Sequence, residues 1–298
     1  MSVRINPDPA PDLLAAIASN RLAQNTALQQ ISTGQVVNQL SDNPAAASQD
    51  VLIHVQNNQD DQFLKNISAL QSQGQTIDST LSSVVQAVTQ AISLGVEGAN
   101  GTLSDSNRQA VALQLTGIRD QVLGLANQTY QGNYVFSGTA TSTQPFVLDA
   151  TQPDGVKYNG NTDVNSIEIT SGQTIPINLP GSQIFTNPSG DLLGALNGLI
   201  TALQNNSGLP AANTNLDKAF TQLTTQRVFY GNTLQQLQSS QTYLNSDKLQ
   251  LATQANSLVG ADLATSITNL EQANTATNAI LSATNQILTT LNLLNYLK

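Results

Sequence analysis

Apolar residues that recur at alternating intervals of three and four positions are the feature that most constrains the fold of this chain. The spacing continues from Phe63 to Ala91, with Gly74 as its one gap. An apolar residue about every 3.5 positions forms a stripe along one face of a helix, and such stripes pack together as in coiled coils. Asn43 and Pro44 fit the N-cap and the first helical position. We therefore predict one helix from about Pro44 to the Leu94-Gly95 region.

Two further stretches have the same spacing. One starts near Ser104 and should pack antiparallel on the first helix, because the connection is short. The other extends from 216 to 258, where Arg227, Gln241 and Lys248 interrupt the apolar stripe. Polar groups at such positions lower stability but fix the register of paired helices. The predicted rod seam consists of Phe63, Ile67, Leu70, Ile77, Leu81, Val84, Leu115, Ile118, Val122, Leu223, Tyr230, Leu234 and Leu237.

Both ends of the chain are also predicted to be helical, but their apolar stripes are thinner. Arg21 and Gln24 interrupt the first one, which should end at Gly34, and several alanines occupy the last one. Alanines bury little area, so such a helix is held weakly by a single partner. We expect these faces to find their partners in other copies of the chain. The predicted assembly interface consists of Leu14, Ile17, Leu28, Ile31, Leu263, Ile267, Leu270, Ile280, Ile287 and Leu294.

Between about residues 132 and 185 the period of the apolar pattern changes to two. Short strands are predicted at 134–136, 146–148, 156–158, 167–169 and 175–177, separated by turn residues such as Asn159-Gly160. A short helix should follow Asp191. The predicted class is mainly α with a small β insert: a long antiparallel helical rod or coiled coil formed by both termini, with a β-rich domain in mid-chain. The predicted domains are 1–40 plus 262–298, 41–131 plus 190–261, and 132–189.

The composition excludes several kinds of chemistry. The chain has no Cys and one His, and only 10% of its residues are charged. Thiol nucleophiles, disulfides and Cys- or His-rich metal sites are therefore excluded. The formal net charge of −9 has the wrong sign for binding nucleic acid or an anionic membrane. No long apolar run or basic-then-apolar leader occurs, so we expect neither a membrane span nor a cleaved secretory signal.

The remaining candidate sites have simpler explanations. Asp50 and His54 could be drawn as a carboxylate and a general base, but their spacing is typical of a surface pair on a helix. The neighbouring Asp60 and Asp61 are interpreted as part of a solvated face. Acidic residues of the insert lack the pattern of a calcium loop and are expected to cap their own turns: Asp149, Asp154, Asp163 and Glu168. We predict no enzyme, no metal and no cofactor.

Several segments resemble the flagellin family. These are QISTG at 30–34, SDNPAAAS at 41–48 and LNLLNYL at 291–297. Other segments are more similar to the members that lie at the hook–filament junction than to filament flagellin: NGTLSD at 100–105, GIRDQ at 117–121, LAN at 125–127 and GNYVFSG at 132–138, with Pro145-Phe146 after it. Asn43 departs from the more frequent second aspartate, but it caps a helix equally well.

This resemblance implies a structural subunit of the bacterial flagellum, extracellular and exported unfolded without a cleaved signal. It implies that the terminal helices form an inner tube, the longer helices an outer layer, and that the β insert projects outward. The implied partners are other copies of the chain in a ring, hook-associated protein 1, flagellin and a cytoplasmic export chaperone. Two alternatives stay open: a flagellin that forms the filament itself, and a coiled-coil scaffold without a flagellar role.

Overall fold

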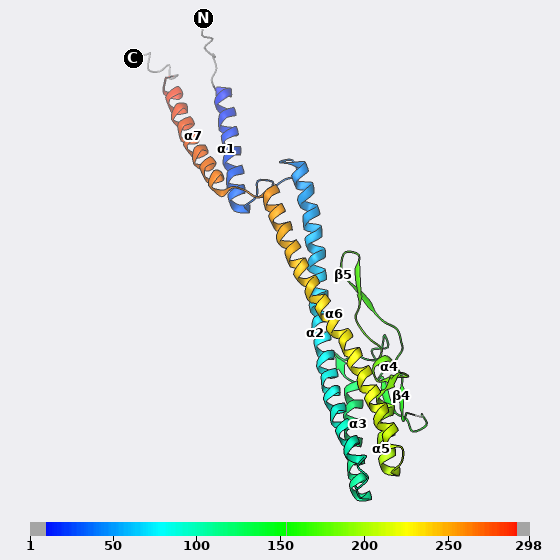
Figure 1. Cartoon of the computed structure of the whole chain (residues 1–298). Helices are drawn as coiled ribbons and strands as arrows, with labels where there is room; N and C mark the ends of the chain where they lie inside the picture. Colours follow the sequence, from blue (N-terminus) through cyan, green and yellow to red (C-terminus); the bar gives the residue numbers. More distant parts are fainter. Residues whose placement is uncertain (1–9, 153, 291–298) are drawn as a thin grey trace. The chain divides into compact units, whose positions relative to one another are not determined.

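The chain, described here by a computed structural model over residues 10–152 and 154–290, divides into two compact units (Figure 1). Residues 1–59 and 247–298 belong to one, which we call the terminal unit, and residues 60–246 form the central unit. The two longest helices contribute residues to both. The predicted class, mainly helical with small sheets in mid-chain, is confirmed. The helices are α1 (Ala10–Thr33), α2 (Pro44–Gly98), α3 (Asp105–Ala126), α4 (Gly181–Ile184), α5 (Leu192–Asn205), α6 (Leu209–Val259) and α7 (Leu263–Thr290).

The predicted starts of three helices are confirmed by side chains that accept hydrogen bonds from the first turn. The Asn43 Oδ1 accepts from the Ala46 N–H at 3.1 Å, Ser104 caps α3, and the Asp191 Oδ1 accepts from the Gly194 N–H at 2.9 Å. Each bond satisfies an amide that the helix itself leaves unpaired. The turn after α2 is short, and α3 returns along α2 as predicted (Figure 1).

The predicted end of α2, in the Leu94-Gly95 region, was three to four residues early, because the helix ends at Gly98. Gly95 and Gly98 are buried in the helix, where a Cβ on Gly95 would lie 3.0 Å from the Leu199 side chain. Leu203 packs against Gly98 in the same way. Both glycines therefore allow α5 to approach α2 closely. The helix continues past Gly95, where packing compensates for the low helix propensity of glycine, and ends at Gly98.

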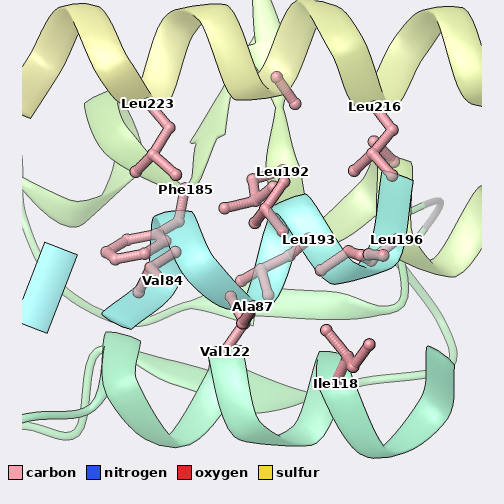
Figure 2. Close-up of a cluster of buried hydrophobic side chains, with 14 of the residues drawn as sticks. Val84, Ala87, Ile118, Val122, Phe185, Leu192, Leu193, Leu196, Leu216 and Leu223 are labelled. Carbon is pink, nitrogen blue, oxygen red and sulfur yellow. The ribbon is translucent and has the colours of Figure 1, made fainter. Parts of the chain in front are cut away.

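The main core of the central unit joins α2, α3, α5 and α6 with Ile184 of α4 and with residues of the β part. Figure 2 shows part of α2 between α6 and α3, with the side chains of Leu192, Leu193 and Leu196 of α5 directed into the cluster. Val84 of α2, Val122 of α3 and other seam residues complete the packing. The buried members of the predicted seam are Ile67, Leu70, Ile77, Leu81, Val84, Leu115, Ile118, Val122, Leu223, Tyr230 and Leu237, whereas Phe63 and Leu234 are partly buried.

The gap at Gly74 has a packing reason. A Cβ at this position would lie 2.9 Å from Leu234 Cδ2, so the side chain of α6 fills the place that a larger residue would occupy on α2. Polar interruptions of the seam also have partners across the two helices. Arg227 binds both oxygens of Asp78 at 2.8 and 3.2 Å, and the Gln71 amide donates to Gln241 Oε1 at 3.2 Å. These pairs specify one register of α2 against α6.

Within the described residues, the strands of the β part form four two-stranded antiparallel sheets. Val135 and Phe136, predicted as strand, leave β2 and enter the core, where the Phe136 carbonyl accepts from the Gly181 N–H at 2.8 Å. Phe146 packs against Tyr158 and Phe185 with ring centroids 5.0 and 5.4 Å apart. The pairs are β1 (Thr129–Tyr130) with β2 (Asn133–Tyr134), β3 (Phe146–Leu148) with β4 (Val156–Tyr158), β5 (Ser166–Thr170) with β6 (Gln173–Pro176), and β7 (Thr186–Asn187) with β8 (Gly190–Asp191).

The β5–β6 hairpin covers a second, smaller core. Ile169 and Ile175 of the hairpin pack with Ile67, Leu237 and other residues of α2 and α6. The insert therefore contributes to the stability of the paired helices. The boundaries between the two units fall inside α2 and α6, and the predicted division into three domains stays a prediction.

Candidate assembly surface

The terminal helices α1 and α7 pack on each other through small residues. Ala27 and Ala273 are 3% and 5% exposed, and Ser266 is 3% exposed. Small side chains let the two backbones approach closely but remove little apolar area from water. Hydrophobic burial within this pair therefore contributes little to its stability.

Side-chain amides supply much of the specific contact between the two helices. The Asn20 Nδ2 donates to the Ala273 carbonyl at 2.7 Å and to the Thr277 hydroxyl at 2.6 Å. The Gln24 Nε2 donates to the same hydroxyl at 2.9 Å, and Ser266 Oγ lies 3.2 Å from Gln30 Oε1. Polar contacts of this kind fix the register of α1 on α7, and each contributes modestly to stability in the presence of water.

A short backbone ladder fixes the base of this pair. Gly34 has a φ of +69°, the left-handed conformation predicted for a C-cap, and the Ala261 N–H donates to its carbonyl at 2.8 Å. The Val36 N–H donates to the Val259 carbonyl at 2.7 Å. Asp262 caps α7 by accepting from the Ala264 N–H at 2.9 Å, and its hydrogen bonds with Thr265 lower the pKa of that carboxyl. These hydrogen bonds hold the C-terminal end of α1 beside the N-terminal end of α7.

Large apolar side chains point away from the α1–α7 contact. Leu14 and Leu28 of α1 are 67% and 52% exposed, and Leu263 and Ile267 of α7 are each 47% exposed. Four other residues of the predicted assembly interface are partly buried: Ile17, Ile31, Leu270 and Ile280. The side chain of Ile287 and all of Leu294 lie outside the described residues. The structure thus places the described members of this set on α1 and α7, and it leaves their role in assembly a prediction.

Other exposed apolar residues of the terminal unit were not predicted. Leu22 is 69% exposed and Leu281 53%, and Val51, Leu52 and Val55 form an exposed group near the start of α2. Leu22 lies eight residues after Leu14, which places it about 80° further round the helix, outside the predicted stripe through Ile17 and Ile31. The apolar stripe that predicts Ile17 and Ile31 therefore gives no signal for Leu22. Together these residues enlarge the apolar surface of the terminal unit.

A shallow groove of about 590 Å³ lies along the same helix pair. It is lined on α1 by Leu22, Ala23 and Ala27 and on α7 by Ala273 and Ala276, with amides at its edges. Small residues along a groove, beside a large exposed leucine, are complementary in shape to another helix. The groove and the exposed leucines make this pair the candidate assembly surface.

The candidate chemical sites remain structural. His54 Nε2 lies 3.4 Å from Asp50 Oδ2 one helical turn away, on an exposed side chain, which confirms the surface pair. Asp149 accepts from the Thr151 hydroxyl at 2.6 Å, which lowers the pKa of its carboxyl and confirms a turn-capping role. The prediction for Asp60 was wrong, because this residue is 5% exposed. Among residues 10–152 and 154–290, no cluster of three metal-ligating side chains and no helix suited to span a membrane is found.

Comparison with known proteins matches this architecture to one family. Residues 9–141 match the model of the bacterial flagellin N-terminal helical region. Over 248 residues the chain is 30% identical to flagellar hook-associated protein 3 of Escherichia coli strain K12, covering 78% of this chain and 74% of that protein. The chain belongs to the flagellin family. The resemblance found in the sequence is thereby confirmed, and this flagellin-family chain is a structural protein of the flagellum rather than an enzyme.

Two further relatives of this flagellin-family chain agree. It is 36% identical over 160 residues to flagellar hook-associated protein 3 of Salmonella typhimurium, a match that spans 53% of this chain and 49% of the relative. The fold is similar to that of the flagellar junction protein FlgL of Legionella pneumophila, with a TM-score of 0.62 and 15% identity, over 71% of this chain and all of that one. At this identity the second likeness concerns the fold alone.

Proposed function

We propose that the chain is the adaptor that joins the flagellar hook to the flagellin filament. Relatives at 30% and 36% identity are named hook-associated protein 3, and a chain of similar fold is described as a flagellar junction protein, which supports this proposal. In this role copies of the chain form a ring, bind hook-associated protein 1 on one side and accept flagellin on the other. A cytoplasmic export chaperone covers the apolar helices before export.

The observation that carries the proposal is the unpartnered apolar face of α1 and α7. The pair itself uses alanine, serine and amide side chains, whereas Leu14, Leu22 and Ile267 remain about half exposed or more. Soluble monomers rarely expose apolar surface of this extent unless it forms an interface with a partner. Identical copies related by rotation would cover it by head-to-tail contacts that close into a ring.

The magnitudes are consistent with assembly through several contacts. Burying one leucine or isoleucine side chain contributes about 1.5–3 kcal/mol. Association costs about 4–15 kcal/mol of translational and rotational freedom. One leucine cannot offset that cost, but several together can, so the surface as a whole is the functional unit. In the assembled ring, residues 1–40 and 262–298 line the inner tube, the paired α2 and α6 form the outer layer, and residues 132–189 project outward.

The first test replaces one exposed apolar residue by a charged one. In a deletion strain complemented with the Ile267→Asp variant, we expect export but loss of incorporation, because a carboxylate in a buried contact would have no partner. Thr268→Asp is the matched control, since Thr268 is the exposed polar neighbour of Ile267. Incorporation of both variants at wild-type levels would show that this face is not an assembly contact.

A second test addresses the position of the chain in the flagellum. Deletion of the gene should leave hooks without filaments while flagellin is released into the medium, because the filament has no surface on which to begin. Complementation with the intact chain should restore filaments. Normal filaments in the deletion strain would rule out the adaptor role. Hooks without filaments, together with the absence of any other filament-forming protein from the medium, would indicate that the chain itself is a flagellin.

The third test concerns the state of the terminal helices before assembly. We expect fast hydrogen exchange in residues 12–33 and 262–297 of the free chain and slow exchange in the assembled flagellum, since α1 and α7 bury little apolar area alone. The buried segments of α2 and α6 in the central unit are the internal reference. Equal protection of both regions in the free chain would contradict folding on assembly.

A further inference from the structure

Three Asn-Gly pairs occur in the chain, and the structure holds them in different ways. They are Asn100-Gly101, Asn159-Gly160 and Asn197-Gly198. When the N–H that follows an asparagine can reach its side-chain carbon, the two groups condense without a catalyst. Glycine favours the reaction because no side chain obstructs the attack and its backbone rotates freely. The local structure therefore decides which of the three pairs reacts.

Asn100 lies in the exposed turn between α2 and α3. Its side-chain Oδ1 accepts hydrogen bonds from the Thr102 N–H at 3.2 Å and from the Thr102 hydroxyl at 2.9 Å. This turn folds the carboxamide back over the next peptide bond, and the two donors withdraw electrons from its carbonyl. Gly101 is exposed, nothing lies within 4 Å of where its Cβ would be, and its N–H makes no hydrogen bond to any described residue.

The Asn197-Gly198 pair is held rigidly. The Asn197 Nδ2 donates to the Asp154 carbonyl at 2.5 Å, and its Oδ1 accepts from Arg119 at 3.0 Å. Gly198 lies inside α5, where backbone N–H groups bind the carbonyl four residues earlier. Its nitrogen cannot attack while the helix persists.

The Asn159-Gly160 pair is intermediate. The Asn159 side chain is exposed, but the Asn159 N–H donates to the Pro145 carbonyl at 2.7 Å. A Cβ on Gly160 would lie 2.8 Å from the Ser137 carbonyl oxygen, and the next residue, Asn161, donates its N–H to the same carbonyl. Asn100 also has backbone hydrogen bonds, to the Glu97 carbonyl at 3.1 Å and from the Leu103 N–H at 3.0 Å. The close contacts at Gly160, which Gly101 does not have, are therefore what opposes the rotation that the attack requires.

We propose that Asn100 is a site of spontaneous deamidation in the folded protein. The Gly101 nitrogen attacks the Asn100 side-chain carbon and forms a new C–N bond. The bond from that carbon to Nδ2 breaks, and ammonia leaves with the proton that Gly101 has lost. Water then opens the resulting succinimide ring at one of its two carbonyls, which gives aspartate or isoaspartate. Thr102 acts as a positioning residue, because it holds the carboxamide without taking part in the bonds exchanged.

The product changes the turn electrostatically. A carboxylate at position 100 lies just past the C-terminus of α2, where the helix dipole disfavours negative charge. Glu97 and Asp105 are the nearest acidic residues in the sequence on either side. Like charges so placed weaken the turn, and isoaspartate also lengthens the backbone there by one carbon. In a long-lived extracellular structure, the fraction converted would increase with age.

Peptide mass spectrometry of the purified full chain tests this inference. After incubation in mildly alkaline buffer, conversion at Asn100 should exceed that at Asn197 by at least about tenfold, the ratio produced by about 1.4 kcal/mol of activation free energy. In a urea-unfolded sample the three sites should react at similar rates. Equal rates at all three sites in the folded chain, or a faster rate at Asn159 than at Asn100, would overturn the proposal.

Two variants separate the causes. Gly101→Ala should slow conversion strongly without affecting the fold, since the new methyl group would meet no neighbour within 4 Å. Thr102→Val should slow conversion in the folded chain but leave the unfolded rate almost unchanged. If Thr102→Val converts as fast as the wild type when folded, the turn does not position the carboxamide. None of these readouts depends on the proposed adaptor role.

Discussion

The terminal and central units bury different kinds of side chain. Both apolar core clusters lie within residues 60–246. In the terminal unit, the described pair of α1 and α7 is joined by alanines, a serine and amide hydrogen bonds, and large apolar residues such as Leu14 and Leu22 stay exposed. Eleven of the twelve Phe and Tyr residues also belong to the central unit, and the exception is Tyr296.

This difference indicates that the two units of the chain are stabilised in different ways. Aromatic residues contribute a large buried area each, so a region that contains them can fold as an independent monomer. The terminal unit buries few large apolar side chains internally and exposes several of them on its surface. In the proposed assembly, neighbouring copies would supply the partners for this surface. Substitutions in the two units should have opposite consequences for folding and for assembly.

The largest effect on stability is expected at Phe185. Its ring is fully buried and packs edge-on against Phe136 and Phe146, with centroids 5.2 and 5.4 Å apart. Phe185→Ala should lower the free energy of unfolding of the full chain by about 3–5 kcal/mol, measured by urea titration. Leu148→Ala, on β3 but 52% exposed, is the control and should change it little. A small loss at Phe185 would show that the central core does not depend on the aromatic cluster.

The next effect concerns a buried hydroxyl that connects the insert to α6. The Leu179 N–H donates to the Tyr230 hydroxyl at 3.1 Å, and burial raises the pKa of that tyrosine. Tyr230→Phe leaves the Leu179 N–H without an acceptor, which should cost about 1–3 kcal/mol in urea titration. Tyr243→Phe, at a 61% exposed site of the same helix, serves as the control. Equal stability of the two variants would mean that water reaches the Leu179 amide.

The positions of the helices could be predicted from the sequence because each signal was local. Caps at Asn43, Ser104 and Asp191 and the regular apolar spacing specify where helices begin and which face is buried. The end of α2 was predicted too early, since Gly95 resembles a terminator in sequence, whereas in the structure it is a helical residue on which Leu199 packs. A glycine required for close approach and one that ends a helix are identical in sequence.

The candidate assembly surface could be predicted only in part. Leu14 and Leu28 were found because thin stripes in long helices suggest missing partners. Leu22 and Leu281 were missed, because which face of α1 contacts α7 is decided by Asn20, Gln24 and Ala273, and pairing between residues some 250 positions apart has no local signal. The burial of Asp60 was also missed.

A pH dependence is expected in the central unit. Burial, together with the neighbouring Asp154 carboxylate, raises the pKa of Asp191 from 3.8 to about 6, although the Gly194 N–H opposes the shift. The folded chain therefore binds this proton more tightly than the unfolded chain. Its contribution to stability is complete below the unfolded pKa of 3.8 and is lost as the pH rises through about 6.

Asp191→Asn should remove this part of the pH dependence, because an amide cannot ionise but still accepts from the Gly194 N–H. Urea titrations at several pH values across the window would measure it. Asp149→Asn is the comparison: hydrogen bonds from Thr151 lower the pKa of Asp149, so its contribution is lost as the pH falls. If Asp191→Asn keeps the wild-type slope, the ionisation of Asp191 does not cause this pH dependence.

A smaller effect is expected for the ion pair between α2 and α6. Arg227 and Asp78 are each about one third exposed, and both hydrogen bonds between them are formed. A double-mutant cycle with Arg227→Ala and Asp78→Ala should give a coupling of about 0.5–1 kcal/mol that decreases in high salt. A coupling near zero would leave the neighbouring Gln71–Gln241 contact and the apolar seam as the determinants of register.

The smallest effect on the free chain, and the sharpest contrast between the units, is expected at Leu28. Because this side chain is 52% exposed, Leu28→Gln should change the free energy of unfolding by no more than about 0.5 kcal/mol. The same variant should be incorporated poorly into flagella, since the residue then brings an amide to a contact that buries a leucine. Ala27→Gln, one position earlier, is buried against α7 and should instead weaken the α1–α7 pair in the free chain, visible as faster hydrogen exchange in α1. If Leu28→Gln destabilises the free chain as much as Ala27→Gln does, then Leu28 already has a partner within the monomer, and the terminal unit does not depend on neighbours for its apolar contacts.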